Sequence, residues 1–359
     1  MPHVPSLLPP RRPLSLRPPP RAPSRLREAL VALALPLAAQ ALVALPLVAL
    51  PLASHAQPAA FPNKPIRLVC AHAAGGAADQ LSRIVSQQLS NALGQPVVVE
   101  NRPGASTMIA AEQVARSPAD GYTLLMATVT TLSINPALYP KMRYDPIKDF
   151  APISIVASTP FFLGVNAALP ITSVRELVAA AKASPGGLNY GWAGQGTSSH
   201  LAGELFTSMS NTQMVHVPYK ATATRNTDLS AGSIQVVFGN DLLEFAKTGK
   251  VRILGVTSAQ RLSGYPDIPT VAEAGSMPGY DASVWYGLVA PAGTPTAIVA
   301  KINEALRTAV ADPAVRQEIM STLGGDAVGS TPEAFASVIK SDRDKWTQVI
   351  SRAHIKAEE

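Results

Sequence analysis

The sequence predicts an α/β protein of two lobes, each built on an open, largely parallel sheet with helices on both faces. Two observations predict this fold class. Strand-like and helix-like segments alternate almost without exception after residue 60, as in chains made of repeated strand–helix units. The alternation continues for about 300 residues, which is more than one sheet usually organises.

The expected strands are short apolar runs that end at turn residues. They cover 66–70, 96–100, 122–127, 150–157, 161–166, 188–194, 214–219, 234–240, 251–258 and 282–291.

The expected helices show apolar residues at helical spacing or begin with a capping residue. They cover 79–93, 110–116, 173–183, 198–210, a segment near Asp228, 242–247 and most of 296–352. In the first of them, Asp79 is the expected N-cap and Gly94 the expected stop. Ser173 and Glu176 have the spacing of a capping box.

No Pro/Gly/Ser-rich linker separates the two expected lobes. Strands that cross twice between the lobes explain this absence. We therefore expect a discontinuous first lobe of residues 57–157 plus 258–359, a second lobe of 158–257, and a hinged cleft between them. In such sheets ligands bind beyond the carboxyl ends of the strands.

The basic charge of the chain is concentrated at its start. The net charge is +6, and residues 1–56 hold six arginines against one glutamate. The rest of the chain is close to neutral, which argues against a nucleic-acid partner.

Residues 1–56 have the order of a secretory signal peptide. An arginine- and proline-rich start precedes an uncharged run over 29–53, and "SHA" (54–56) provides small residues before a cut ahead of Gln57. The run is also long enough for a membrane anchor, but its three prolines and the cleavage site favour removal. We expect export to the periplasm.

The residue types give little support for chemistry that needs a metal or a disulfide. Cys70 is the only cysteine and lies in an apolar run, so we expect a small buried side chain and no intrachain disulfide. The sequence has no histidine spacing typical of a metal site. No cofactor is expected. His72 and His216 are interpreted as satisfied strand histidines.

Two loops have the composition of an anion site. "AAGGAAD" (73–79) and "GWAGQGTSSH" (191–200) each follow a strand and lead into a helix. Glycines let a ligand approach the backbone closely, and a helix N-terminus offers unpaired N–H groups. Hydroxyls in the second loop could add to a carboxylate cradle. A third candidate is "ATVTT" (127–131), and two loops in two lobes suggest a clamp.

A serine hydrolase is the catalytic alternative, with Ser198 or Ser199 as nucleophile and His200 as base. Adjacent helical residues do not face each other, and the nucleophile-elbow pattern is absent. We therefore expect a binding protein and not an enzyme. Trp192 and Trp285 could wall a cleft or belong to the core.

Nine collinear blocks from about Phe61 onward resemble the Bug family, the periplasmic receptors of tripartite tricarboxylate transporters. The blocks are "FPNKPIRLV", "GQPVVVENRPGA", "ARSPADGYTLLM", "INPALY", "DFAPIS", "NYGWAGQGTSSHLAGELF", "VHVPYK", "IPTVAEAG" and "VWYGLVAPAGTP". The resemblance implies a Venus-flytrap fold, similar to type II periplasmic binding proteins, that closes around a small carboxylate or a related solute. Main-chain amides, hydroxyls and ordered water would hold the carboxylate.

The resemblance also implies a set of ligand-binding residues. They are Ala74, Gly75, Gly76, Asp79, Thr128, Thr130, Trp192, Gly194, Gly196, Thr197, Ser198, Pro218, Tyr219 and Asn240.

This chain departs from the family pattern at three places. Residues 71–74 replace a proline-rich segment, Ala221 replaces a glycine, and Gly239 replaces an aspartate that can pair with an amino group. The loss of this aspartate favours a dicarboxylate or a solute with an uncharged tail over an amino acid.

The expected function is that of a monomeric receptor that delivers its solute to inner-membrane permease subunits. A receptor that signals to a sensor kinase is the alternative.

Overall fold

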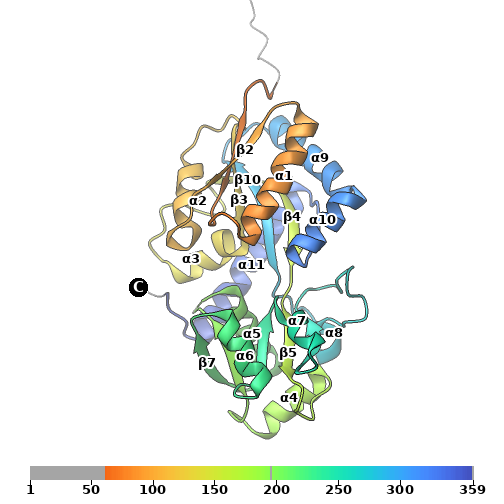
Figure 1. Ribbon diagram of the computed structural model, residues 1–359. Coiled ribbons are helices and arrows are strands. Elements are labelled where there is room, and N and C mark those ends of the chain that lie inside the picture. Colours follow the sequence, from red (N-terminus) through yellow and green to blue (C-terminus); the bar gives the residue numbers. More distant parts are fainter. Residues whose placement is uncertain (1–60, 195, 358–359) are drawn as a thin grey trace, which may run out of the picture. The chain divides into compact units, whose positions relative to one another are not determined.

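The structure is a computed structural model that describes residues 61–194 and 196–357 (Figure 1). Six strands form its first sheet. Their order is β11-β4-β10-β3-β1-β2. The bounds are β1 (Ile66–Cys70), β2 (Val97–Asn101), β3 (Thr123–Thr128), β4 (Phe150–Thr159), β10 (Val284–Pro291) and β11 (Asp326–Ala327). β1 pairs in parallel with β2 and β3, whereas β10 runs antiparallel to β3 and β4.

Five strands form the second sheet, in the order β7-β6-β8-β5-β9. They are β5 (Phe162–Asn166), β6 (Asn189–Ala193), β7 (Val215–Tyr219), β8 (Val236–Gly239) and β9 (Val251–Val256). β6 is parallel to β7 and β8, and β5 is antiparallel to β8 and β9.

Both sheets are mixed, which corrects the expectation of largely parallel sheets. β4 leaves the first sheet and passes into β5 after two residues. β10 returns to the first sheet after β9, so it must run against β4. The two crossings therefore impose antiparallel neighbours. The exact lobe boundaries at 157/158 and 257/258 stay a prediction.

The directions of the strands place the expected loops. β1 and β3 run in the same direction as β4, towards the second sheet, whereas β6, β7 and β8 run opposite to β5, back towards the first. The carboxyl ends of all five strands consequently point to the region between the two sheets. This is where solute-binding loops are expected.

The helices cover the sheets, and each predicted helix has a counterpart close to its expected position, whereas the short helices over 135–138 and 271–275 were not predicted. Their bounds are α1 (Ala77–Leu93), α2 (Met108–Ala115), α3 (Asn135–Leu138), α4 (Val174–Ala183), α5 (Ser198–Ser210), α6 (Thr222–Ala231), α7 (Leu242–Lys247), α8 (Val271–Gly275), α9 (Thr296–Ala311), α10 (Pro313–Leu323) and α11 (Pro332–Arg352). A 3₁₀ turn, η1 (Ala105–Thr107), precedes α2, and a π-helical turn, η2 (Thr130–Ile134), precedes α3.

Two helix starts differ from their predictions. The N-cap of α1 is Gly76, so Asp79 lies in the first turn and is not the cap. Ser173 caps α4 through the Glu176 N–H, but the Glu176 carboxylate accepts from Thr172 and not from the cap residue. The acidic side chain reaches one residue further back than in a reciprocal capping box.

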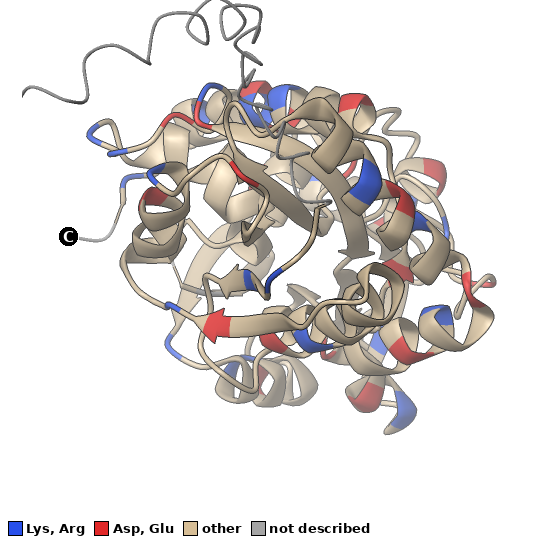
Figure 2. Cartoon of the chain, turned by 90° about the horizontal axis from the view of Figure 1, so that it is seen from above, with Lys and Arg blue, Asp and Glu red and all other residues tan. Residues whose placement is uncertain are grey.

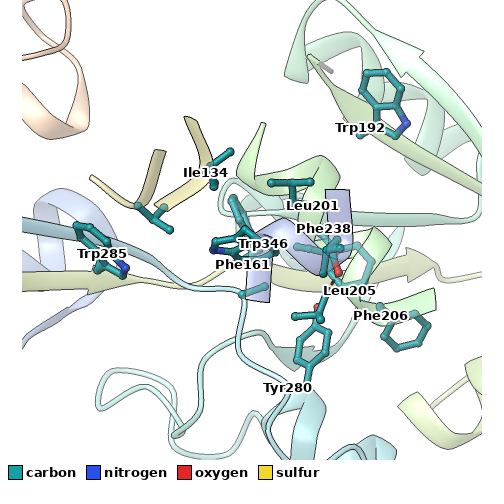
Figure 3. Packing of buried hydrophobic residues seen from close by; sticks show 14 of the residues in the cluster. Ile134, Phe161, Trp192, Leu201, Leu205, Phe206, Phe238, Tyr280, Trp285 and Trp346 are labelled. Atoms are coloured by element: carbon teal, nitrogen blue, oxygen red, sulfur yellow. Dashed lines mark hydrogen bonds between the residues drawn. The ribbon is translucent and has the colours of Figure 1, made fainter. Parts of the chain in front are cut away.

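One hydrophobic cluster contains residues of both sheets and of α11. Phe161, Leu201 and Phe238 belong to it together with Trp346, and Figure 3 draws part of this packing. Backbone hydrogen bonds stabilise the region where the strands cross between the lobes: Phe161 O accepts from Thr257 N, and Thr257 O accepts from Ala282 N. Burial of Trp346, which is 1% exposed, joins α11 to this region.

Basic and acidic residues are interspersed along the helices (Figure 2). This distribution agrees with the neutral balance expected for the body of the chain. No helix in the described part of the chain is long and apolar enough to span a membrane. The predicted signal peptide, residues 1–56, lies outside the described residues.

Candidate functional site

The first loop joins β1 to α1 and exposes its backbone. Ala74, Gly75 and Gly76 are exposed, and Gly75 has a φ of +84° that favours glycine. Gly76 has no side chain with which to cap α1. The amides of the first turn are therefore available to an anion, and the helix dipole adds positive potential there.

Asp79 stabilises this loop through hydrogen bonds of its side chain. Its side chain is buried, one carboxylate oxygen accepts from Gly75 N at 2.9 Å and from Arg83 Nε at 3.0 Å, and the other accepts from Asn101 Nδ2 at 2.9 Å. Burial alone would raise its pKa, but these bonds keep the pKa below its ordinary value. Because both oxygens are occupied by protein donors, the geometry favours a loop-positioning role for Asp79.

The second candidate segment follows β3, the neighbour of β1 in the sheet. Thr128 is buried, and its hydroxyl lies 3.3 Å from that of Thr131. Thr130 is half-buried and begins η2. The carboxyl ends of two adjacent parallel strands thus bring the two first-lobe segments to one edge.

The glycine-rich loop after β6 has the same plan in the other lobe. Gly194 and Gly196 have φ values of +88° and +70°. Thr197 is the N-cap of α5, and its hydroxyl donates to Gly194 O at 2.8 Å. Ser198 is the first helical residue and is half-buried. The loop therefore presents backbone amides and hydroxyls at a helix N-terminus.

The remaining predicted residues lie on the strands beside β6. Trp192 and Pro218 are register partners, as are Ala193 and Tyr219. Pro218 is exposed, whereas the Tyr219 hydroxyl donates to Asp228 Oδ2 at 2.7 Å and is directed to α6. Asn240 is exposed directly after β8. Tyr219 thus contributes its ring and backbone rather than a free hydroxyl.

The glycine-rich loop approaches an element of the other lobe at the candidate site. A Cβ added to Gly196 would lie 3.0 Å from Cδ1 of Leu138. Leu138 ends α3, which follows η2 and Thr130. The glycine-rich loop therefore lies against the helix that continues the Thr130 segment.

Two buried polar atoms near these loops have no hydrogen-bond partner among the described residues: His72 Nδ1 and Trp192 Nε1. The interpretation of His72 as a satisfied strand histidine is wrong, since it lies in the loop after β1. Buried polar atoms are usually paired with protein or water. A ligand or ordered water at these strand ends would supply the missing partners.

A histidine–glutamate–histidine cluster lies behind the glycine-rich loop. Ligand-type atoms of His200, Glu204 and His216 lie within 4.8 Å of one another, which would suit a metal ion. However, His200 Nδ1 accepts from Gly196 N at 3.1 Å, whereas a metal-bound imidazole needs a proton on that second nitrogen and donates from it. The geometry fits a hydrogen-bond network better than a metal site.

The same contacts argue against the serine hydrolase. His200 Nδ1 is occupied by Gly196, and Nε2 lies 3.2 Å from Glu204 Oε1. The Ser199 hydroxyl lies 3.2 Å from that of Thr197. No imidazole nitrogen of His200 is left to activate Ser198 or Ser199.

Sequence reasoning did not identify a buried arginine beside the β8–α7 turn. Arg225 of α6 is 1% exposed, and its Nη2 donates to Asp241 Oδ1 at 3.0 Å. Asn226 Nδ2 donates to Asp241 Oδ2 at 2.8 Å. No sequence pattern links these residues.

Glu204 was not identified from the sequence either. Its spacing of four residues from His200 on one helix is the sequence signal that could have predicted their contact.

The fold and these loops define the class of protein: a two-lobed solute-binding protein. The family described as Tripartite tricarboxylate transporter family receptor matches residues 81–355. BugT of Bordetella pertussis is 32% identical over 81% of this chain and 89% of its own length.

Solved structures give the same relationship. Rpa4515 of R. palustris with adipate is 34% identical and superposes with a TM-score of 0.66 over 82% of this chain and 99% of its own. MatC of Rhodopseudomonas palustris with bound malate is 30% identical, with a TM-score of 0.62 over 81% and 100%. The chain belongs to the Bug family of tripartite tricarboxylate transporter receptors. It is a solute-binding receptor and not an enzyme.

Proposed function

We propose that the protein is a periplasmic receptor that binds a small organic carboxylate between its lobes. The single observation that carries this proposal is the matched pair of loops after β1 and β6, each glycine-rich and each opening a helix N-terminus. Such termini favour anions without needing a lysine or arginine. The adipate and malate complexes of two relatives support the same class of ligand.

The ligand is proposed to lack an amino group. The carboxylate of Asp79 is paired with Arg83, and that of Asp241 is paired with Arg225. A carboxylate already neutralised by a guanidinium attracts a ligand ammonium weakly. Dicarboxylates and carboxylates with an uncharged tail fit this charge pattern better than amino acids.

A thermal-unfolding screen tests the proposal. Succinate, malate, adipate and glutarate should be compared with aspartate and glutamate at equal concentration. A ligand present at 100 times its dissociation constant stabilises by about 2.7 kcal/mol, so a true ligand raises the unfolding midpoint clearly. A panel in which only amino acids raise the midpoint would contradict the proposed ligand class.

Delivery of the solute to a tripartite tricarboxylate-type permease completes the proposed function. The family description supports this role. Uptake of labelled ligand by cells that contain the permease should require this receptor. Ligand binding without any receptor-dependent uptake would separate the two parts of the proposal.

A further inference from the structure

The His200 side chain is hydrogen-bonded to Gly196, the centre of the glycine-rich loop. It occupies the first turn of α5, is 4% exposed, and accepts the Gly196 N–H through Nδ1 at 3.1 Å. Gly196 itself is in a left-handed conformation and close to Leu138. The imidazole therefore fixes the amide of the loop residue that lies near Leu138 of the other lobe.

The hydrogen bond determines which ring nitrogen carries the proton. A neutral imidazole has one donor and one acceptor nitrogen, and the neighbours select the tautomer. Since Nδ1 accepts from Gly196, the proton is on Nε2. Nε2 lies 3.2 Å from Glu204 Oε1, which can accept it.

Glu204 is ionised and can therefore accept the hydrogen bond from His200 Nε2. It is 8% exposed, so burial raises its pKa, but the hydrogen bonds from His200 and His216 lower the pKa to about 2. His216 Nδ1 lies 3.0 Å from the same Oε1. An ionised carboxylate only accepts hydrogen bonds, so it opposes the tautomer with the proton on Nδ1.

The ring is also held by stacking. Trp192 lies over His200 with ring centroids 4.2 Å apart and an interplanar angle of 18°. Trp192 comes from β6 and Glu204 from the next turn of α5. Position and tautomer of the imidazole are thus set by separate elements.

We propose that His200 is the positioning residue of the ligand loop. Glu204 keeps the imidazole proton on Nε2, and the unprotonated Nδ1 accepts the Gly196 N–H and so keeps this amide in the orientation that the carboxylate site requires. The expected effect on ligand affinity rests on the proposed function, whereas the tautomer of His200 is independent of it.

Nitrogen NMR of the wild-type protein tests the tautomer directly. The ¹⁵N chemical shifts of the His200 ring should show a protonated Nε2 and an unprotonated Nδ1 near neutral pH. A protonated Nδ1 would overturn the proposal whether or not any carboxylate binds. This measurement needs no variant and therefore does not depend on the folding of one.

Two isosteric variants then test positioning. In His200→Asn the amide oxygen can take the place of Nδ1 and accept from Gly196, whereas in His200→Gln the amide reaches the place of Nε2 and contacts only Glu204. We expect His200→Gln to lose about tenfold in ligand affinity, as for one lost hydrogen bond to a site amide, and His200→Asn to keep most of it.

Equal losses in both variants, with equal circular dichroism and unfolding midpoints, would show that Nδ1 has no special role. If the wild type binds no carboxylate, the proposed function fails and the tautomer still stands or falls on the NMR spectrum. Glu204→Gln provides a further check, because its amide can donate to Nε2. We expect this variant to show some of the Nδ1-protonated tautomer.

Discussion

The carboxylate of Asp241 and the guanidinium of Arg225 meet where a side chain at residue 239 would begin. Their closest atoms, Oδ1 and Nη2, are 3.0 Å apart. A Cβ on Gly239 would lie 2.7 Å from Nη2 and 2.8 Å from Oδ1. A side chain at residue 239 would therefore have to displace the ion pair, and the Asp241 carboxylate beside it is neutralised by Arg225.

Arg225→Met should change ligand selectivity. It removes the cation but keeps the hydrogen bond from Asn226 to the Asp241 carboxylate, so this carboxylate attracts a ligand ammonium more strongly. We expect aspartate to gain roughly fivefold over succinate, which corresponds to about 1 kcal/mol, as measured by calorimetry. Arg225→Lys, which keeps a positive charge, is the matched control. An unchanged ratio of aspartate affinity to succinate affinity in Arg225→Met would show that Arg225 does not shield the Asp241 carboxylate from the ligand.

Gly239→Ala should destabilise the protein because the new methyl group would force the ion pair of the buried Arg225 with Asp241 to shift. We expect the free energy of unfolding to fall by about 1–3 kcal/mol, measured by urea denaturation. In an Asp241→Gly background one of the two obstacles is absent, so the same substitution should cost less. Equal costs in both backgrounds would show that the pair does not restrict residue 239.

The sequence predicted the elements and loops better than the interactions between them. Alternating apolar segments and glycine stops are local signals, and the strands and helices lie close to where these signals placed them. The two lobe crossings were expected from the absence of a linker, but the antiparallel neighbours that they impose are not encoded by local spacing. Arg225 and Asp241 are 16 residues apart, and Glu204 and His216 meet across a helix and a strand. Such partners are set by tertiary packing, so the candidate site was predicted as loops and not as networks.

Gly76→Val should abolish ligand binding and leave the fold intact. Gly76 has a φ of −78°, which valine adopts readily, and a Cβ there would meet only Ala73 O at 3.5 Å. The unfolding midpoint should therefore stay within about 2 °C of the wild type. The branched side chain would cover the first-turn amides of α1. Wild-type affinity in this variant would move the carboxylate site away from the β1–α1 loop.

His216 should make stability depend on pH. Its hydrogen bond to Glu204 raises its pKa above the ordinary value of about 6.5. The contribution of the charged pair is then complete below about pH 6.5 and is lost as the pH rises through the folded-state pKa. Glu204, with a pKa of about 2, stays ionised throughout this window.

His216→Asn isolates this effect, because asparagine can donate to Glu204 but cannot become charged. The free energy of unfolding of the wild type should exceed that of His216→Asn by more at about pH 5.5 than at about pH 9. Urea unfolding at both pH values measures the two differences. A difference that is independent of pH would show that His216 does not titrate against Glu204.

Trp192→Phe should weaken ligand binding with only a small net change in stability, because relief of an unsatisfied donor offsets part of the lost packing. The indole N–H is buried and has no partner in the described part of the chain, so its removal relieves an unsatisfied donor while a phenyl ring can still stack on His200. If that donor faces the ligand or a water that bridges to it, affinity should fall about fivefold.

Trp346→Phe is the matched control, because Trp346 also carries a buried indole N–H without a partner in that part of the chain, but on α11 rather than at a strand end. Both variants remove the same atom, so only a loss of affinity confined to Trp192→Phe assigns the donor to the solute site, and equal affinities in the two variants would remove Trp192 from it.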